Sequence, residues 1–206
     1  MSASAYETWV TAVRAWRDDP RHDLTALPAL RVDSLPPAAY ERLFEHIRAA
    51  QQRVMDRWSE TFARDWGAAK DDHGRVRALI ATRVMLARRL QLAGHPGLPE
   101  TVRTEFTAGV ARDVRTLQTD LETAVTKQTG HRFDPLQTNR ILGLLRSNRL
   151  TAILEPGFPL QALIDGRIDT PSLPEPPIPV APQSRATDAP PATPARRKHR
   201  AIVIGD

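Results

Sequence analysis

Two segments of the chain, residues 37–69 and 99–129, repeat apolar side chains at spacings of three or four over about thirty residues each. This spacing places the apolar side chains on one face of a helix and is incompatible with a strand, where the period is two. The first stripe contains Tyr40, Phe44, Ile47, Val54, Trp58, Phe62 and Trp66, with Leu43 and Ala50 alongside, and the second contains Val102, Phe106, Val110, Val114, Leu117, Leu121 and Val125. The mean step of the second stripe, about 3.8 residues, exceeds the heptad value and therefore indicates a bundle helix rather than a coiled coil.

Shorter helical patterns flank these two segments. Residues 5–17 and 72–93 carry the same periodicity, and Ser34, Asp71-Asp72 and Asp134-Pro135 stand where helix N-caps are expected. Short apolar segments at 136–145, 150–154 and 160–168 follow Gly130. We therefore predict an all-α fold, an elongated helical bundle of about four main helices plus short C-terminal helices.

The length of the two longest patterns has a further consequence. At ~1.5 Å per residue each helix would reach roughly 45–50 Å, whereas a compact domain of ~170 residues has a radius of gyration of about 15–16 Å. We expect an elongated bundle, and we expect it to complete its core by forming a homo-oligomer.

Composition divides the chain into four parts. Residues 1–130 form the predicted long-helix bundle, and residues 131–169 a short-helix subdomain packed on it. Residues 170–195 are dominated by proline and predict a disordered, polyproline-rich linker. Residues 196–206 form a basic and apolar C-terminal peptide.

Catalytic and metal-binding motifs are missing from the sequence. The chain contains no cysteine, no HExxH, no Glu-x-x-His pair, no phosphate-binding glycine loop and no GxSxG. We interpret Asp71-Asp72-His73 as a helix cap rather than a metal cluster, because acidic residues stabilise a helix N-terminus. We predict no cofactor, no metal site and no catalytic residues.

Hydropathy and net charge limit the partners that the chain can have. No segment approaches the roughly 18 apolar residues of a membrane span, and the N-terminus has no secretory pattern, so we expect a cytoplasmic protein without membrane contact. The net charge is +5, of which residues 183–206 carry +3, so the basic character lies mainly in the tail.

One candidate site lies in residues 131–154. Its basic residues are Arg132, Arg140, Arg146 and Arg149, and its two short helical patterns could form a helix-turn-helix that contacts nucleic acid. We favour the other interpretation, a bundle-capping subdomain with solvated arginines.

The second candidate is the C-terminal peptide. Its basic residues are Arg196, Arg197, Lys198 and Arg200, and its apolar residues are Ile202, Val203 and Ile204. The peptide could add as a strand to a partner's sheet edge, fold back on its own bundle, or begin the first strand of a further α/β domain.

We favour a non-enzymatic structural and interaction protein, a helical bundle that docks a protein partner through the tethered C-terminal peptide. The alternative is a nucleic-acid-associated protein that uses the basic tail and the 140–149 region. A third hypothesis is an enzyme whose polar residues converge from different helices, which sequence spacing does not reveal.

Overall fold

The computed structural model describes residues 4–31 and 35–168. All of these residues belong to one compact unit. The predicted linker 170–195 and C-terminal peptide 196–206 therefore lie outside the described residues.

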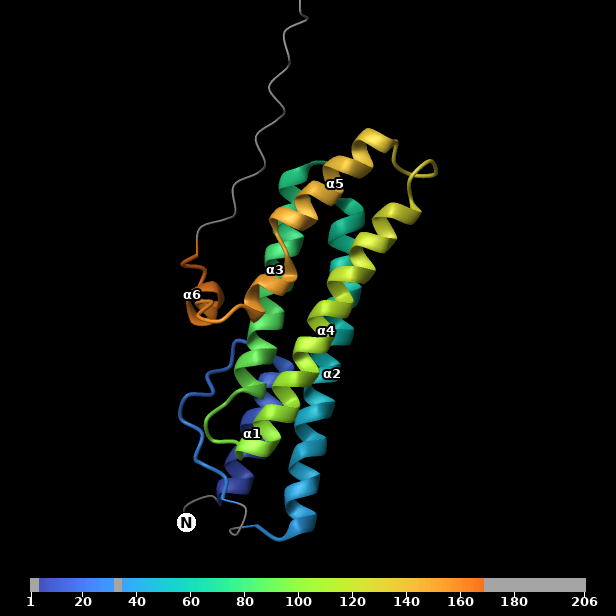
Figure 1. Cartoon of the computed structure of the whole chain (residues 1–206). Helices are drawn as coiled ribbons and strands as arrows, with labels where there is room; N and C mark the ends of the chain where they lie inside the picture. Colours follow the sequence, from blue (N-terminus) through green and yellow to red (C-terminus); the bar gives the residue numbers. More distant parts are fainter. Residues whose placement is uncertain (1–3, 32–34, 169–206) are drawn as a thin grey trace, which may run out of the picture. The chain divides into compact units, whose positions relative to one another are not determined.

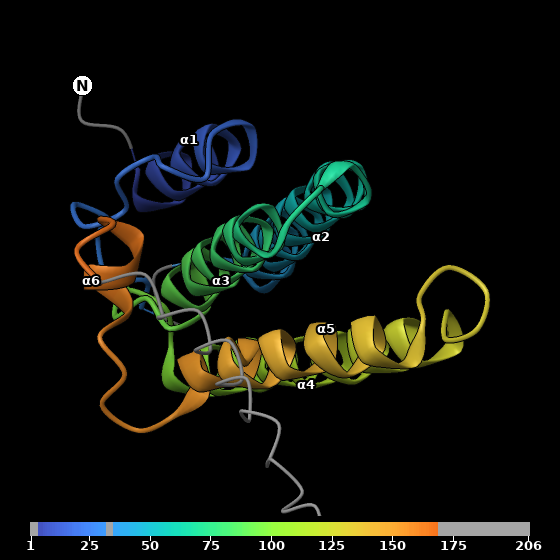
Figure 2. The same ribbon diagram turned by 90° about the horizontal axis from the view of Figure 1, so that it is seen from above.

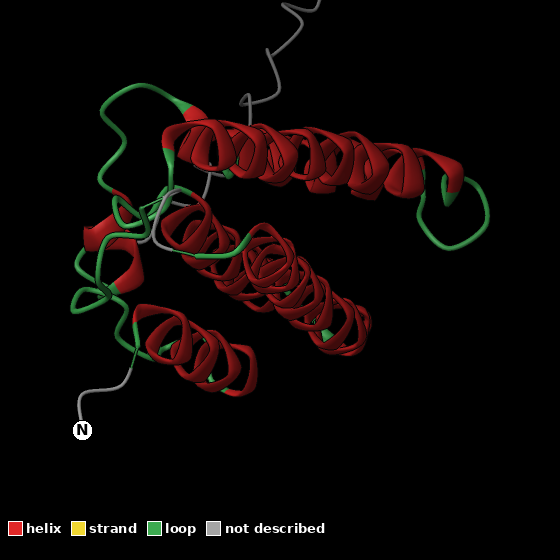
Figure 3. Cartoon of the chain, turned by 90° about the horizontal axis from the view of Figure 1, so that it is seen from below, coloured by secondary structure: helices red, strands yellow, loops and turns green. Residues whose placement is uncertain are grey.

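The described residues form helices joined by loops, without a strand (Figures 1 and 3). The all-α prediction is confirmed: four main helices are followed by short ones. In chain order they are α1 (Ala5–Asp18), α2 (Pro37–Ala68), α3 (Asp72–Ala93), α4 (Glu100–Lys127), α5 (Pro135–Ser147), the 3₁₀ helix η2 (Leu150–Leu154) and α6 (Leu160–Ile164).

The two longest helices run without interruption. α2 has 32 residues and α4 has 28, which correspond to lengths of about 48 Å and 42 Å. None of the described helices is both long and apolar enough to cross a membrane. Self-association through these helices stays a prediction.

Side-chain caps start three of the helices. Ser4 and Asp134 each form a capping box, with Glu7 and Gln137 respectively, and Asp71 accepts a hydrogen bond from a backbone N–H of α3. The predicted cap of α2 is wrong. Its N-cap position is Pro36, which provides no side-chain acceptor, and Ser34 lies outside the described residues.

α3 is the helix around which the others pack. It contacts α2, α4, α5, η2 and α6, and Figure 2 shows it between α1 on one side and the α4–α5 pair on the other. Its buried positions point in most directions around the helix axis and are Val76, Ala78, Leu79, Thr82, Arg83, Met85, Leu86, Ala87, Arg89, Leu90, Leu92 and Ala93. A helix that is buried nearly all round belongs to the core of the bundle.

Aromatic side chains fill the space between α2 and α4. Phe44 of α2 meets Phe106 of α4 edge-on, with ring centroids 6.0 Å apart, and Tyr40 packs edge-on against Phe44 at 4.5 Å. The Arg48–Glu105 ion pair joins the two helices on the surface beside these rings. Large rings therefore keep α2 and α4 in contact although few backbone positions of the two helices approach closely.

Trp9 and His95 attach the N-terminal segment to the bundle. The Trp9 indole is completely buried and donates a 2.7 Å hydrogen bond to the carbonyl of Pro28. The buried His95 ring packs edge-on against Trp9, and its Nε2 lies 2.8 Å from the carbonyl of Leu24. The N–H of Gly97 donates to Nδ1, so Nδ1 is unprotonated and Nε2 is the donor to Leu24. The surrounding backbone thus selects a neutral imidazole.

This environment predicts a pH-dependent stability. Burial lowers the pKa of His95, against a smaller opposing effect of its hydrogen bond to Leu24. The unfolded chain takes up a proton near pH 6.5 while the folded chain does not, so the free energy of unfolding falls as the pH drops below about 6.5. We expect a slope of up to about 1.4 kcal/mol per pH unit between pH 6.5 and 5, measured by urea denaturation. The slope should disappear in His95→Gln and persist in His46→Gln, whose side chain is exposed; equal slopes in both variants would contradict the assignment.

Candidate functional site

Two hollows adjoin the short connection between α2 and α3. The first, which we name the basic pocket, has a volume of about 400 Å³ and is lined by Lys70, Asp71, Asp72, Arg75, Arg132, Phe133, Gln137, Arg140 and Ile141. The second, which we name the alanine pocket, has a volume of about 620 Å³ and is lined by Asp65, Ala68, Ala69, Lys70, Asp71, Gly74, Arg77, Ala78 and Ala81. Both volumes lie within the range of small-molecule sites in proteins.

The first turn of α3 positions the two carboxylates of the basic pocket. Asp71 is the N-cap, and its Oδ1 accepts a 2.8 Å hydrogen bond from the N–H of Gly74. This bond lowers the pKa of Asp71, and the positive charges of His73, Arg77 and Arg75 act in the same direction. The interpretation of Asp71 as a helix cap is confirmed.

Asp72 joins two arginines that are far apart in the sequence. Its Oδ1 accepts a 3.2 Å hydrogen bond from Arg75, one turn further along α3, and its Oδ2 pairs with Nε of Arg140 on α5. The side chains of Asp72 and Arg75 are only 13% and 19% exposed, whereas that of Arg140 is 70% exposed. Asp72 therefore fixes Arg75 within the wall of the pocket and holds the exposed Arg140 beside it.

The loop between α4 and α5 forms another wall. Gly130 has a positive φ of 78°, and its N–H donates to the carbonyl of Phe133, which closes the loop on itself. The Thr129 and Thr138 hydroxyls lie 3.0 Å apart and connect the loop to α5. The guanidinium of Arg132 lies over the Phe133 ring, 5.9 Å from its centroid. The loop thus places a cation and an aromatic ring together at the pocket.

The balance of charge in the basic pocket is positive. Four cationic side chains and two carboxylates line it, which gives a net charge of +2. Arg75 and Arg140 are paired with Asp72, whereas Lys70 and Arg132 form no ion pair within the described part of the chain. The arrangement is suited to an anionic ligand, because two cations at its wall lack a counter-charge.

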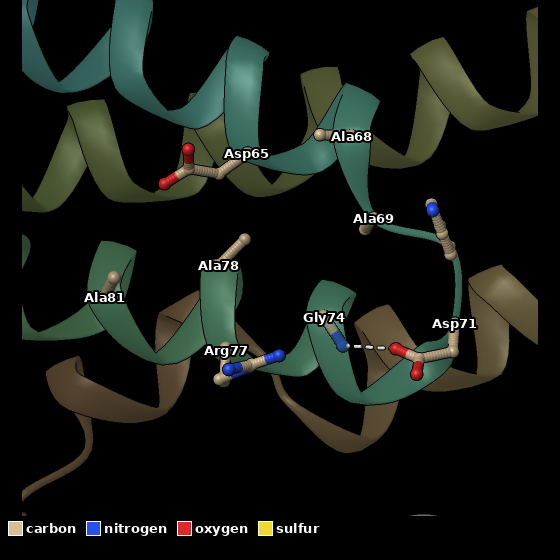
Figure 4. A pocket seen from close by; sticks show the side chains of 9 residues that line it. Asp65, Ala68, Ala69, Asp71, Gly74, Arg77, Ala78 and Ala81 are labelled. Carbon is tan, nitrogen blue, oxygen red and sulfur yellow. Dashed lines mark hydrogen bonds between the residues drawn. The ribbon is translucent and has the colours of Figure 1, made fainter.

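The alanine pocket offers less chemistry. Figure 4 shows Ala68 and Ala69 at the end of α2 facing Gly74, Ala78 and Ala81 on α3. Two of its charged side chains, Asp65 and Arg77, come from opposite walls, and neither makes a hydrogen bond across the pocket among the described residues. Small side chains explain the hollow, because they leave the space between the two helix ends unfilled.

The structure brings together two of the four arginines that the sequence suggested. Arg132 and Arg140 both line the basic pocket. Arg146 is exposed on the last turn of α5, and Arg149 pairs with Glu155 on the surface, so neither belongs to the pocket.

The helix-turn-helix considered for residues 131–154 does not form in the structure. Residues 150–154 make a 3₁₀ helix whose Leu150 and Ile153 are buried, and η2 contacts α3 and α4. Gln118 of α4 fixes this segment by accepting a 2.8 Å hydrogen bond from the N–H of Leu150. A recognition helix has to be free to enter a groove, so this segment does not serve as one.

Sequence reasoning missed Lys70 and Arg75 as site residues. The three-residue spacing of Asp72 and Arg75 on one helix was the available local signal. The pair between Asp72 and Arg140 spans 68 positions and had no local signal. The predicted partner-binding residues, Arg196, Arg197, Lys198, Arg200, Ile202, Val203 and Ile204, lie outside the described residues.

Comparisons of the chain with known protein families, with curated proteins and with solved structures found no match. Within residues 4–31 and 35–168, no group of three or more histidine, aspartate or glutamate side chains could hold a metal ion. The candidate site therefore rests on the geometry of the basic pocket itself.

The Asp72 bridge makes a testable contribution to stability. Asp72→Asn leaves the largely buried Arg75 without its counter-charge and should lower the free energy of unfolding by about 1–2 kcal/mol in urea denaturation. Glu155→Gln is the matched control, because it removes a carboxylate whose pair with Arg149 is more than half exposed, and it should change stability by less than about 0.5 kcal/mol. Equal losses in both variants would show that Asp72 acts as an ordinary surface charge.

Proposed function

We propose that the protein is a non-catalytic binding protein whose helical bundle carries a C-terminal docking peptide for a protein partner. The peptide is residues 196–204, in which the basic run Arg196–Arg200 precedes Ile202, Val203 and Ile204.

The observation that supports this proposal is that the bundle buries nearly all of its own large apolar side chains. Leu136, which is 80% exposed, is the one large apolar side chain that stands open to solvent among the described residues. Trp9, Trp16, Leu43, Leu79 and Leu86 are all completely buried. The bundle thus satisfies its own apolar side chains, whereas the sequence places a further apolar run at 202–204 among charged residues.

The chemistry of the peptide defines the partner surface that suits it. Three consecutive β-branched residues favour an extended strand, whose backbone groups can pair with an exposed sheet edge. Alternate side chains then enter pockets, while the basic residues accelerate association with an acidic surface. The partner we expect is a protein that has an open sheet edge beside acidic residues.

Deletion of residues 196–206 should abolish capture of the partner. In a pull-down read by mass spectrometry, a protein recovered with the full chain should be missing with the truncated chain, while helical circular dichroism stays unchanged. Ile202→Asp with Ile204→Asp should give the same loss, because charge does not enter apolar pockets. A control in which Arg167→Gln removes a basic residue of the bundle should retain capture. Retained capture after the deletion would rule out the docking peptide.

A second candidate function, association with nucleic acid, is favoured by the basic pocket. Arg132 and Arg140 lie there with Lys70 and Arg75, so four cations from three segments of the chain converge. Contacts between cations of this kind and backbone phosphates supply most of the sequence-independent affinity of proteins for nucleic acid.

This candidate predicts a specific salt dependence. The logarithm of the binding constant for duplex DNA should fall linearly with the logarithm of salt concentration, with a slope of about −0.9 per phosphate contact. Arg132→Gln with Arg140→Gln should reduce the magnitude of the slope by about 2, whereas Arg146→Gln with Arg149→Gln, outside the pocket, should leave it unchanged. Absent or salt-insensitive retention in a filter-binding assay would remove this candidate.

A further inference from the structure

The basic pocket also has the features of a site for a small ligand, and this inference is independent of the docking peptide. Its walls come from the α2–α3 connection with the first turn of α3, from the α4–α5 loop, and from α5. All of its lining residues lie in the described part of the chain.

Two guanidinium groups are oriented before any ligand enters. Arg75 donates to Asp72 through Nη1 and Arg140 through Nε, and neither makes another hydrogen bond within the described residues. Each guanidinium carries five N–H donors in a rigid plane, so most of these donors remain available. An oxyanion with several acceptor oxygens can therefore bind without displacing Asp72 from Arg75.

The charge of the pocket suits a dianion. The single charge of Asp72 balances only one of the two arginines that it pairs with, Arg75 and Arg140. The carboxylate of Asp71 already accepts a hydrogen bond from the N–H of Gly74. The net charge of +2 corresponds to that of a phosphomonoester, which carries about −1.5 to −2 near neutral pH. A single carboxylate would leave the pocket with a net positive charge.

The remaining walls indicate that the ligand is larger than free phosphate. Phe133 and the buried Ile141 provide an aromatic ring and an aliphatic side chain, and Gln137 adds an amide. The volume of about 400 Å³ greatly exceeds that of a phosphate group and falls in the range of small-molecule sites. A planar aromatic group beside the phosphate would pack against Phe133.

We propose that the basic pocket binds a small phosphomonoester that carries a planar aromatic group, held by Lys70, Arg75, Arg132 and Arg140 and packed against Phe133. The phosphate binds the guanidinium and ammonium groups, and the planar group contacts the aromatic wall.

Isothermal titration calorimetry on the full chain at low salt tests this proposal, with adenosine monophosphate, adenosine and inorganic phosphate as probes. Adenosine monophosphate should bind, inorganic phosphate should bind at least 10-fold more weakly, and adenosine should not bind at millimolar concentration. Lys70→Gln and Arg132→Gln should each weaken the affinity for adenosine monophosphate by about 10-fold, and Phe133→Ala should abolish its advantage over inorganic phosphate. Arg146→Gln, which removes an exposed arginine outside the pocket, should change the affinity by less than twofold. Because the tail is the same in all variants, its basic residues do not contribute to these differences.

Three results would overturn the proposal. One is the absence of binding for adenosine monophosphate at millimolar concentration. Another is an equal loss of affinity in Arg132→Gln and Arg146→Gln, which would show general charge attraction. The third is a short single-stranded oligonucleotide that binds at least 100-fold more tightly than adenosine monophosphate and loses its affinity in Arg132→Gln, which would assign the pocket to nucleic acid instead.

Discussion

The burial of α3 on nearly all sides is the constraint on which the rest of the bundle depends. Leu79, Leu86 and Leu92 are completely inaccessible to solvent, and α2, α4, α5, η2 and α6 all contact this helix. The short helices η2 and α6 cannot form a core of their own, because they have five residues each. They are stable because α3 provides an apolar surface for them.

This burial includes two arginines, Arg83 and Arg89, which are 6% and 4% exposed. Arg89 reaches Asp113 of α4 at 2.7 Å, and that carboxylate is half exposed, so the pair remains partly hydrated. Arg83 has no acidic partner among the described residues, and burial lowers the pKa of its guanidinium. Its aliphatic stem contributes packing, whereas its charged group reduces the net stabilisation from the core. The central helix therefore combines an extensive apolar burial with two buried guanidinium groups, whose buried nitrogens include Arg83 Nε and Arg89 Nε and Nη1.

The sequence predicted what local physics determines. The bounds of α3 and the caps at Asp71 and Asp134 follow from periodicity and from hydrogen bonds within one turn, and they match the structure. The segment at 150–154 shows where local reasoning ends. The burial of Leu150 and the hydrogen bond from its N–H to Oε1 of Gln118 are tertiary contacts, and they hold a 3₁₀ turn where periodicity suggested an ordinary helix. Only part of the basic pocket was predicted, for the same reason. Arg132 and Arg140 were candidates, but the contact of Arg140 with Asp72 depends on how α5 packs against α3.

The pocket is thus a consequence of the fold rather than of a motif. Gly130 lets the chain turn after α4, the Asp134 cap starts α5, and α5 then contacts both α4 and α3, which brings residue 140 to the first turn of α3. Because Asp72 links α3 to α5 through one carboxylate, the same ion pairs that orient the arginines also fasten the short helix to the bundle. Ligand binding at this site would add contacts between the same elements and would raise the free energy of unfolding by RT ln(1 + L/Kd), where L is the ligand concentration, which grows with the logarithm of L above Kd. The proposed docking peptide consists of residues 196–204 instead, so the two proposed activities can be lost independently.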